Sequence, residues 1–312
     1  MRHPVSVVSV YPAEVIALAE QVDALACDAL HRELALEGKP GLVTPSSRGS
    51  HHDMDHACFR RSIAAIAGYF GDCLLLGARG CDLKALQACG LDAEYAMFRA
   101  TGGVNTHKGA VFTLGLLSAA VGRQQARGRI DVSALGEVVA QTWGEAILRS
   151  GREAAMARAD THGLRLRIDH GLPGAREQAA AGFPVLFEVT LPALRKAGSI
   201  RGRWGSRSAL HALFATMAVL PDTNLAYRGG LEGLVWAQAQ AAGFLAAGGL
   251  SAADAAARIA HMGEAFVARW LSPGGSADLL AAAYWLDALE RLAEAGAGTA
   301  LGDAVALDEA GV

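Results

Sequence analysis

Apolar residues recur at spacings of three and four over most of the chain, and this period constrains the fold more than any other feature. From Pro12 to about Glu37 the apolar positions are Val15, Leu18, Val22, Leu25 and Ala29. Such a stripe is typical of one face of an amphipathic helix, and Pro12 suits its first turn. Helical periodicity resumes near Phe59, and further helices are predicted at about 82–100, 105–122, 133–149, 151–160, 206–219, 227–247, 251–271 and 276–296.

Only two short stretches resemble strands. Residues 163–169 alternate apolar and basic side chains, and residues 183–189 are rich in β-branched and aromatic side chains. Neither is long enough to change the class, so we predict an all-α fold. No repeat of fixed period and no clear linker divides the 312 residues. We therefore expect a single large multi-helix globular domain over residues 1–312, with residues 1–11 and about 297–312 frayed.

Composition excludes several classes of partner. The formal net charge is -3, from 28 basic and 31 acidic residues, so no global field attracts nucleic acid or a membrane surface. No uninterrupted apolar run reaches about 18 residues, and the chain start lacks a signal-peptide core. The five cysteines include no C-x-x-C pair and mostly lie on apolar helical stretches, which favours free thiols and a cytoplasmic protein. Apolar residues near the C-terminus, such as Leu279 and Trp285, could complete the core or contact a second subunit.

The first apolar stripe, extended by one step, reaches a carboxylate, Glu33. Burying a carboxylate is costly unless it is paired or binds a ligand. A structural alternative is that Glu33 reaches solvent at the helix end or pairs with an arginine.

The densest cluster of ligating side chains is the polar loop from Arg48 to His56, which includes His51, Asp53 and Asp55. Imidazole and carboxylate groups could bind a transition metal. Mg²⁺ held through carboxylates and substrate phosphates is favoured over zinc, because adjacent residues cannot all face one point.

A second polar motif runs from Thr101 to Gly109 and precedes a strongly apolar helix. Its two adjacent glycines, its capping residues and Lys108 in the first turn resemble a phosphate cradle at a helix N-terminus. The spacing matches no standard phosphate-loop fingerprint, so an ordinary Gly-rich turn before a capped helix remains the alternative.

A third motif, Pro221-Asp222-Thr223-Asn224, interrupts an apolar helix and is followed by Arg228. Asp222 could bind a metal or a ribose hydroxyl, and Arg228 could form a forked contact with a phosphate. The alternative is a helical corner in which Asp222 caps the next helix and Arg228 pairs with a carboxylate.

Taken together, these loops resemble the triphosphoribosyl-dephospho-CoA synthases in a fixed order over about residues 20–240. The shared motifs are Gly38 to Val43, Gly49-Ser50-His51 with Asp53-Met54-Asp55, Thr101 to Gly109, Gly182-Phe183-Pro184, and Asp222-Thr223-Asn224 with Arg228 to Gly233. The resemblance implies transfer of the triphosphoribosyl group of ATP to the ribose 2'-hydroxyl of 3'-dephospho-CoA, with release of adenine. It implies that the product is the prosthetic-group precursor of malonate decarboxylase or citrate lyase, passed on to an acyl-carrier-protein transferase. The loop Gly-Ser-His-His-Asp-Met-Asp favours the malonate decarboxylase branch.

The resemblance and the residue chemistry together predict the site. We expect catalysis by Asp53, Asp55 and Glu33, and Mg²⁺ binding by Asp53, Asp55 and Asp222. The residues expected to bind substrate are Lys39, Arg48, His51, Gly102, Gly103, Asn105, Thr106, His107, Lys108, Asn224, Arg228, Gly229 and Gly230. Two other functions stay open: a Mg²⁺-dependent N-glycosidic hydrolase of nucleotides or ADP-ribose, and a catalytically silent nucleotide-binding helical protein.

Overall fold

The computed structural model describes residues 11–128, 130–157, 172–196 and 205–308, and within these ranges every regular element is helical. The predicted all-α class is therefore confirmed. The longer helices are α1 (Ala13–Ala35), α2 (His56–Ile66), α3 (Tyr69–Ala78), α4 (Leu83–Thr101), α5 (Lys108–Gln125), α6 (Leu135–Ala157), α10 (Ser206–Val219), α11 (Thr223–Ala246), α12 (Ala255–Ala268) and α13 (Gly274–Asp308). Shorter elements are α8 (Ala175–Ala180), α9 (Leu191–Lys196), a π-helical turn at Leu186–Thr190 and 3-10 turns at Val132–Ala134 and Gly249–Ser251.

Two local predictions differ from the structure. The strand-like stretch at 183–189 enters a π-helical turn, in which the Thr190 hydroxyl donates to the carbonyl of Val185 (3.1 Å). The segments 133–149 and 151–160 were predicted as separate helices, but α6 continues through Gly151, which is buried and helical. The last helix, α13, extends to Asp308. The strand-like stretch at 163–169 lies outside the described residues.

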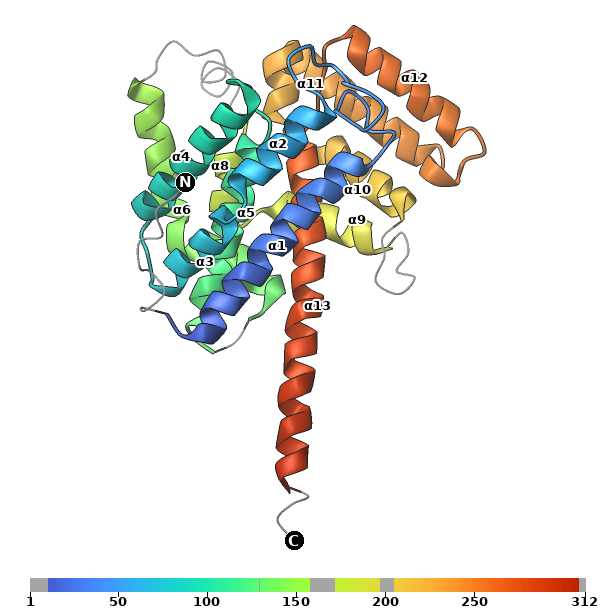
Figure 1. Cartoon of the computed structure of the whole chain (residues 1–312). Coiled ribbons are helices and arrows are strands. Elements are labelled where there is room, and N and C mark those ends of the chain that lie inside the picture. The colour runs from blue at the N-terminus through green and yellow to red at the C-terminus, as the bar shows by residue number, and fades with distance from the viewer. Residues whose placement is uncertain (1–10, 129, 158–171, 197–204, 309–312) are drawn as a thin grey trace.

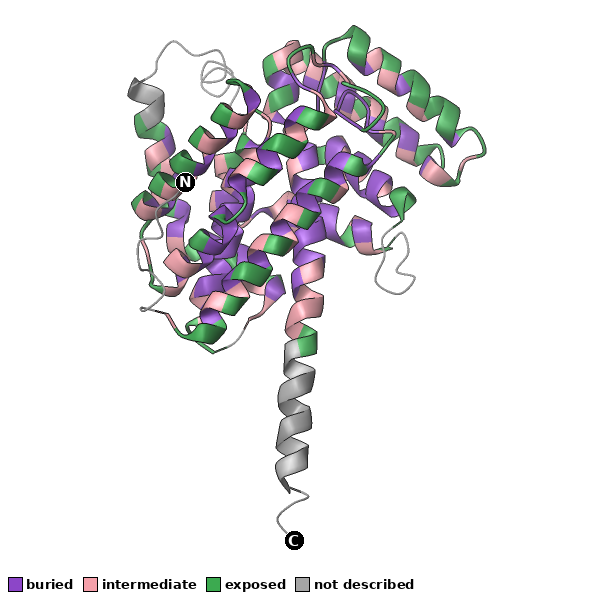
Figure 2. Ribbon diagram, viewed as in Figure 1, coloured by how far each residue is buried: buried purple, intermediate pink, exposed green. Residues whose placement is uncertain are grey.

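The core forms where α13 passes between helices from both halves of the chain (Figure 1). Trp285 on α13 is fully buried, and its indole N–H donates to the carbonyl of Val22 on α1 (3.2 Å). Helices α3 and α5 approach closely through glycines, because a Cβ on Gly77 would lie 1.9 Å from the carbonyl oxygen of Ala119. Buried residues fill α5 and the first turns of α13, while α12 is largely exposed (Figure 2).

The stretch from His56 to Ala78 is the one candidate membrane span that length and hydropathy identify among the described residues. It is two helices rather than one, because the chain breaks at Gly68, whose φ is 91°. Helix α2 packs against α4, and α3 packs against α5 and α1. The apolar side chains of the stretch from His56 to Ala78 therefore pack against other helices of the fold.

The loop between α1 and α2 is fixed against the turn that precedes α13. The Ser50 hydroxyl donates to the carbonyl of Leu271 (2.6 Å), and a Cβ on Gly41 would lie 2.2 Å from the same oxygen. Gly41 also has a φ of 71°, so both its conformation and the close approach require glycine. This contact brings the loop after α1 next to α11 and the start of α13.

Candidate active site

The three polar corners predicted from the sequence line one cavity of about 990 Å³. Asp53 comes from the loop before α2, Lys108 from the first turn of α5, and Asn224 and Arg228 from the start of α11. The other predicted residues that line it are Glu33, His51, Asn105, Thr106 and His107. Residues far apart in the sequence thus share a space large enough for a nucleotide-sized ligand.

Arg228 holds one wall of the cavity together. Its guanidinium donates to the carbonyl oxygens of Ser50 (2.8 Å) and Trp270 (3.0 Å) and to Nδ1 of His51 (2.9 Å). Because arginine can only donate, His51 Nδ1 is the acceptor, and the imidazole proton lies on Nε2, 2.9 Å from the hydroxyl of Ser272. Burial, and after it the charge of Arg228, lower the pKa of His51 to about 4. His51 is therefore a neutral wall residue at neutral pH.

Asp53 and Asp55 have different environments although two residues separate them. Asp53 lines the cavity, its side chain is 61% exposed, and its Oδ1 lies 3.9 Å from His51 Nδ1. Asp55 instead caps α2 by accepting from the backbone N–H of Cys58 (2.9 Å), and it pairs with Arg48 (3.1 Å) on the exterior. These contacts, the backbone hydrogen bond first, lower the pKa of Asp55. Asp55 and Arg48 do not line the cavity.

Glu33 is buried as its stripe predicts, and its partner is a lysine. The ammonium of Lys39 donates to Glu33 Oε1 and to the backbone carbonyl of Glu33, both at 2.6 Å. Both side chains are nearly inaccessible to solvent. Lys39 does not line the cavity, so in this conformation it neutralises Glu33 rather than presenting a charge to a phosphate.

His107 is held by a chain of hydroxyl groups. The Thr106 hydroxyl donates to Ser62 Oγ (2.7 Å), and Ser62 Oγ lies 2.7 Å from His107 Nδ1. Ser62 is fully buried, so its hydroxyl proton needs an acceptor, and His107 Nδ1 is the one within reach. With Nδ1 as the acceptor, the imidazole proton lies on Nε2. His107 Nε2 is buried and has no protein partner. It therefore remains as a hydrogen-bond donor in the wall of the cavity.

Burial lowers the pKa of His107 to about 3, which gives a testable pH dependence of stability. In the unfolded chain this histidine takes up a proton below a pH of about 6.5, whereas in the folded protein it stays neutral. The free energy of unfolding therefore decreases as the pH falls. Between pH 7 and pH 5 we expect His107 to cost the wild type about 2 kcal/mol of unfolding free energy. Urea unfolding of wild type and His107→Asn at both pH values measures this loss, and an equal loss in the two proteins would contradict it.

Lys108 and Asn105 form the turn that opens α5. The side-chain oxygen of Asn105 accepts from the backbone N–H of Lys108 (3.2 Å), as a helix-capping residue does. The ammonium of Lys108 pairs with Glu94 of α4 (2.8 Å) at the edge of the cavity, and half of the lysine side chain is exposed. Lys108 can therefore move from Glu94 to a phosphate without leaving the cavity wall.

The predicted metal triad of Asp53, Asp55 and Asp222 is not assembled. Asp222 is buried and caps α11, accepting from the backbone N–H of Asn224 (3.0 Å) and from the N–H and hydroxyl of Ser276. Burial raises the pKa of Asp222. No group of three or more His, Cys, Asp or Glu side chains within the described ranges could hold a metal ion.

The predicted glycines shape the backbone outside the cavity. Gly102 ends α4 in a left-handed conformation with a φ of 70°, and Gly103 follows with a φ of 92°. Gly230 has a φ of 65° at a kink in α11, where a Cβ on Gly229 would lie 2.5 Å from the side chain of Leu271. None of these four glycines lines the cavity in the structure.

Several polar side chains of the cavity were not predicted from the sequence. They are Gln87, Glu94, Ser150, Arg176, Tyr227, Ser272 and Asp278. Most of them lie on helices whose pattern looked purely structural. Asp278 is the one with a visible signal, because it precedes Ala281 and Trp285 at helical spacings of three and four, on the buried side of α13.

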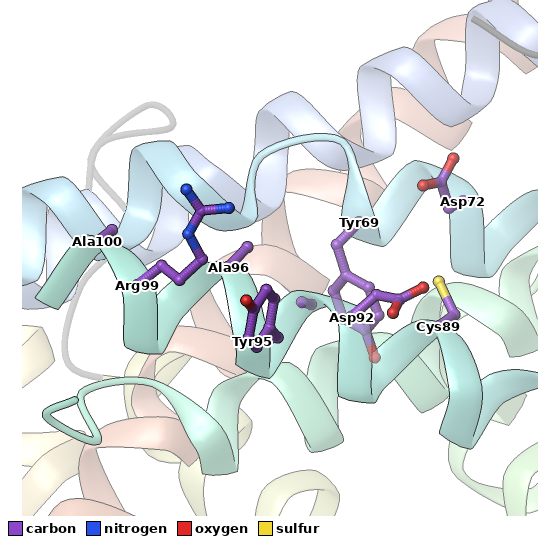
Figure 3. Close-up of a pocket in the computed structure, with 9 residues that line it drawn as sticks. Tyr69, Asp72, Cys89, Asp92, Tyr95, Ala96, Arg99 and Ala100 are labelled. Atoms are coloured by element: carbon purple, nitrogen blue, oxygen red, sulfur yellow. The ribbon is translucent and has the colours of Figure 1, made fainter. Parts of the chain in front are cut away.

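A second, smaller pocket of about 570 Å³ lies along α3 and α4 (Figure 3). Arg99 lies over the ring of Tyr95 there, with 5.9 Å from its guanidinium carbon to the ring centroid. Tyr69 lines both pockets, and its hydroxyl donates to the carbonyl of Val111 (3.1 Å). None of the predicted site residues lines this pocket, so the larger cavity is the candidate site.

The fold and the site together describe a helical protein with a large cavity that presents carboxylates, cations and neutral imidazoles. Comparison with known families is more specific. The sequence model of the ATP:dephospho-CoA triphosphoribosyl transferase family matches residues 19–296, so the chain belongs to this family. The resemblance seen in the ordered motifs is thereby confirmed.

Curated relatives support the same assignment over most of the chain. A protein of Acinetobacter calcoaceticus named probable 2-(5''-triphosphoribosyl)-3'-dephosphocoenzyme-A synthase is 40% identical over 84% of this chain and 88% of its own length. A synthase of that name from Pectobacterium atrosepticum is 40% identical over 85% of this chain and 88% of its own length. No solved structure matches the chain.

Proposed function

We propose that this protein transfers the 5-triphosphoribosyl group of ATP to the 2'-hydroxyl of 3'-dephospho-CoA and releases adenine. Family membership supports the reaction, and one observation of the structure supports the assignment of this reaction to the large cavity. A single cavity joins the loop of Asp53, the first turn of α5 with Lys108, and Arg228 of α11. Such a cavity offers both cations for polyphosphate and carboxylates for acid–base chemistry.

The cations of the cavity favour phosphorylated substrates. We assign Lys108 to the triphosphate, because its ammonium lies at the cavity wall beside the positive dipole end of α5. Arg228 keeps guanidinium N–H groups beyond the three bonds to its own wall, and these are available to a second phosphate. Both substrates carry several phosphates, which suits two cationic corners.

Mg²⁺ fits this cavity as a partner of the triphosphate rather than as a resident ion. Mg²⁺ commonly uses one or two carboxylates together with substrate phosphates. Asp53 is the predicted metal residue that lines the cavity with its carboxylate free of a cap or a close ion pair. Bound there, the ion would neutralise phosphate charge, while Asp55 and Asp222 keep their helix-capping positions.

We propose Asp53 as the base that accepts the proton of the 2'-hydroxyl, either directly or through a water molecule. Asp53→Asn should lower the turnover of adenine release by about 100-fold or more at saturating ATP, and raising Mg²⁺ should not restore it. Asp55→Asn is the matched control, because Asp55 lies outside the cavity. Its stability should change by less than about 1 kcal/mol, because asparagine also caps helices, and most of its turnover should remain. Full turnover of Asp53→Asn would remove this role.

The destination of the product is a further proposal. The loop Gly49 to Asp55 favours the malonate decarboxylase branch over the citrate lyase branch, with the product passed to an acyl-carrier-protein transferase. Mass spectrometry of each purified apo carrier subunit, incubated with the product and its transferase, measures which carrier accepts the group.

One assay separates the proposed function from its two alternatives. The protein is incubated with ATP and Mg²⁺, with and without 3'-dephospho-CoA, while adenine is followed by chromatography and the adduct by mass. Adenine that depends on the acceptor, with an adduct of the combined mass, supports the synthase. Adenine released without the acceptor indicates the N-glycosidic hydrolase, and ATP binding without adenine in either case indicates a silent nucleotide-binding protein.

A further inference from the structure

Asp278 occupies a position on α13 that is built around its carboxyl group. A Cβ on Gly109 would lie 1.9 Å from Asp278 Oδ2, so the carboxyl group fills the space that a side chain on α5 would need. The same carboxyl accepts a hydrogen bond from the backbone N–H of Ala110. Asp278 is thus fixed against the first turn of α5, beside Lys108, and it lines the cavity.

Two carboxylates have the largest electrostatic effect on Asp278 among the charged groups around it. Asp222 and Glu33 are the charged groups that act on it most strongly, and Lys39 beside them is already paired with Glu33. No ion pair to Asp278 is formed within the described part of the chain. Burial and these two carboxylates raise its pKa well above the usual value, against the single lowering effect of the Ala110 N–H. The surroundings of Asp278 therefore favour its protonated form.

A protonated carboxyl group in the cavity matches a requirement of the transfer reaction. The bond between the anomeric carbon and N9 of adenine breaks, and its electron pair leaves with the base. Adenine is a poor leaving group as an anion, so a proton delivered during this step lowers the barrier. The acceptor hydroxyl loses one proton in the same reaction, so the overall proton count balances.

We propose that Asp278 is the general acid that protonates the departing adenine. This inference rests on the proposed function, since it names the acid for that reaction. In each turnover Asp278 gives its proton to a ring nitrogen of adenine, while Asp53 takes the proton of the 2'-hydroxyl as the new C–O bond forms. Exchange with solvent then returns Asp278 to its protonated form and Asp53 to its ionised form.

The test compares two leaving groups in wild type and Asp278→Asn. Asparagine has the shape of the protonated acid and no proton to give, so folding should be retained and adenine release from ATP should fall by about 10²–10⁴-fold. The second substrate is 6-chloropurine riboside triphosphate, whose base departs more readily without protonation. With this substrate, the rate difference between wild type and Asp278→Asn should be smaller than with ATP by roughly tenfold or more. Asp278→Ser, a smaller side chain that cannot act as the acid, should show the same difference.

Controls separate this role from a structural or metal-binding one. Glu290 lies on the same helix and pairs with Arg195 outside the cavity. The variant Glu290→Gln should therefore behave as wild type with both substrates. Equal losses of Asp278→Asn with both leaving groups, or recovery when Mg²⁺ is raised, would overturn the acid assignment. Wild-type adenine release with and without 3'-dephospho-CoA tests the proposed function separately. The comparison of leaving groups applies to transfer and hydrolysis alike, and a wild type that releases no base from either substrate contradicts both proposals.

Discussion

Replacing Glu33 by alanine is expected to lower the free energy of unfolding by roughly 3–5 kcal/mol, because it leaves the ammonium of Lys39 buried without a counter-charge. Lys39 is 4% exposed and both of its hydrogen bonds go to Glu33. Urea unfolding followed by tryptophan fluorescence measures the loss. Asp28→Ala on the same helix is the control, because Asp28 is exposed and its ion pair with Arg32 is a long contact of 4.0 Å. This variant should lose less than about 0.5 kcal/mol.

The double variant Glu33→Leu with Lys39→Met gives the second half of this prediction. Replacing both members of a buried ion pair by apolar side chains is often nearly neutral, so most of the stability should return. Activity should not return, because Glu33 lines the cavity and helps to set the charge around Asp278. A stable Glu33→Ala protein would show that Lys39 reaches solvent and that the pair is not buried in solution.

Arg228→Ala is expected to lower adenine release by roughly 100-fold or more and stability by about 2–4 kcal/mol. The substitution leaves the carbonyls of Ser50 and Trp270 and the Nδ1 of His51 without their donor, and it removes a cavity cation. Kinetics with varied acceptor concentration and urea unfolding measure the two effects.

Two variants test whether the fork of Arg228 matters beyond its charge. Arg228→Lys keeps the charge but cannot reach three acceptors at once, so it should recover only part of the activity. Arg258→Ala removes an exposed arginine that pairs with Asp254 at the start of α12, and it should resemble wild type. Full activity of Arg228→Lys would show that the ordered wall is not required.

Helical periodicity predicted the fold class and most helix positions, because an apolar stripe records which face of a helix is buried. The same reasoning found Glu33, an acid on a buried stripe. The same spacing, continued back from Ala281 and Trp285, reaches Asp278, although the motifs shared with the family end near residue 240.

Local motifs predicted which loops line the cavity better than they predicted the contacts that each residue makes. Asp222 and Asp55 are acids in polar turns, and both cap helices, because backbone N–H groups at a helix start need acceptors. Lys39 was expected to contact phosphate and instead neutralises Glu33. Sequence spacing does not report which acceptor or partner is nearest, since that depends on contacts between distant helices such as the one from Arg228 to Ser50.

The account depends on one cavity holding both substrates, and a crystal structure with the product 2'-(5''-triphosphoribosyl)-3'-dephospho-CoA tests this directly. We predict the triphosphate beside Lys108, and the new ribosyl linkage between Asp53 and Asp278, within the cavity of about 990 Å³. Product bound instead in the pocket of Tyr95 and Arg99, or on the outer surface of the helices, would contradict the account.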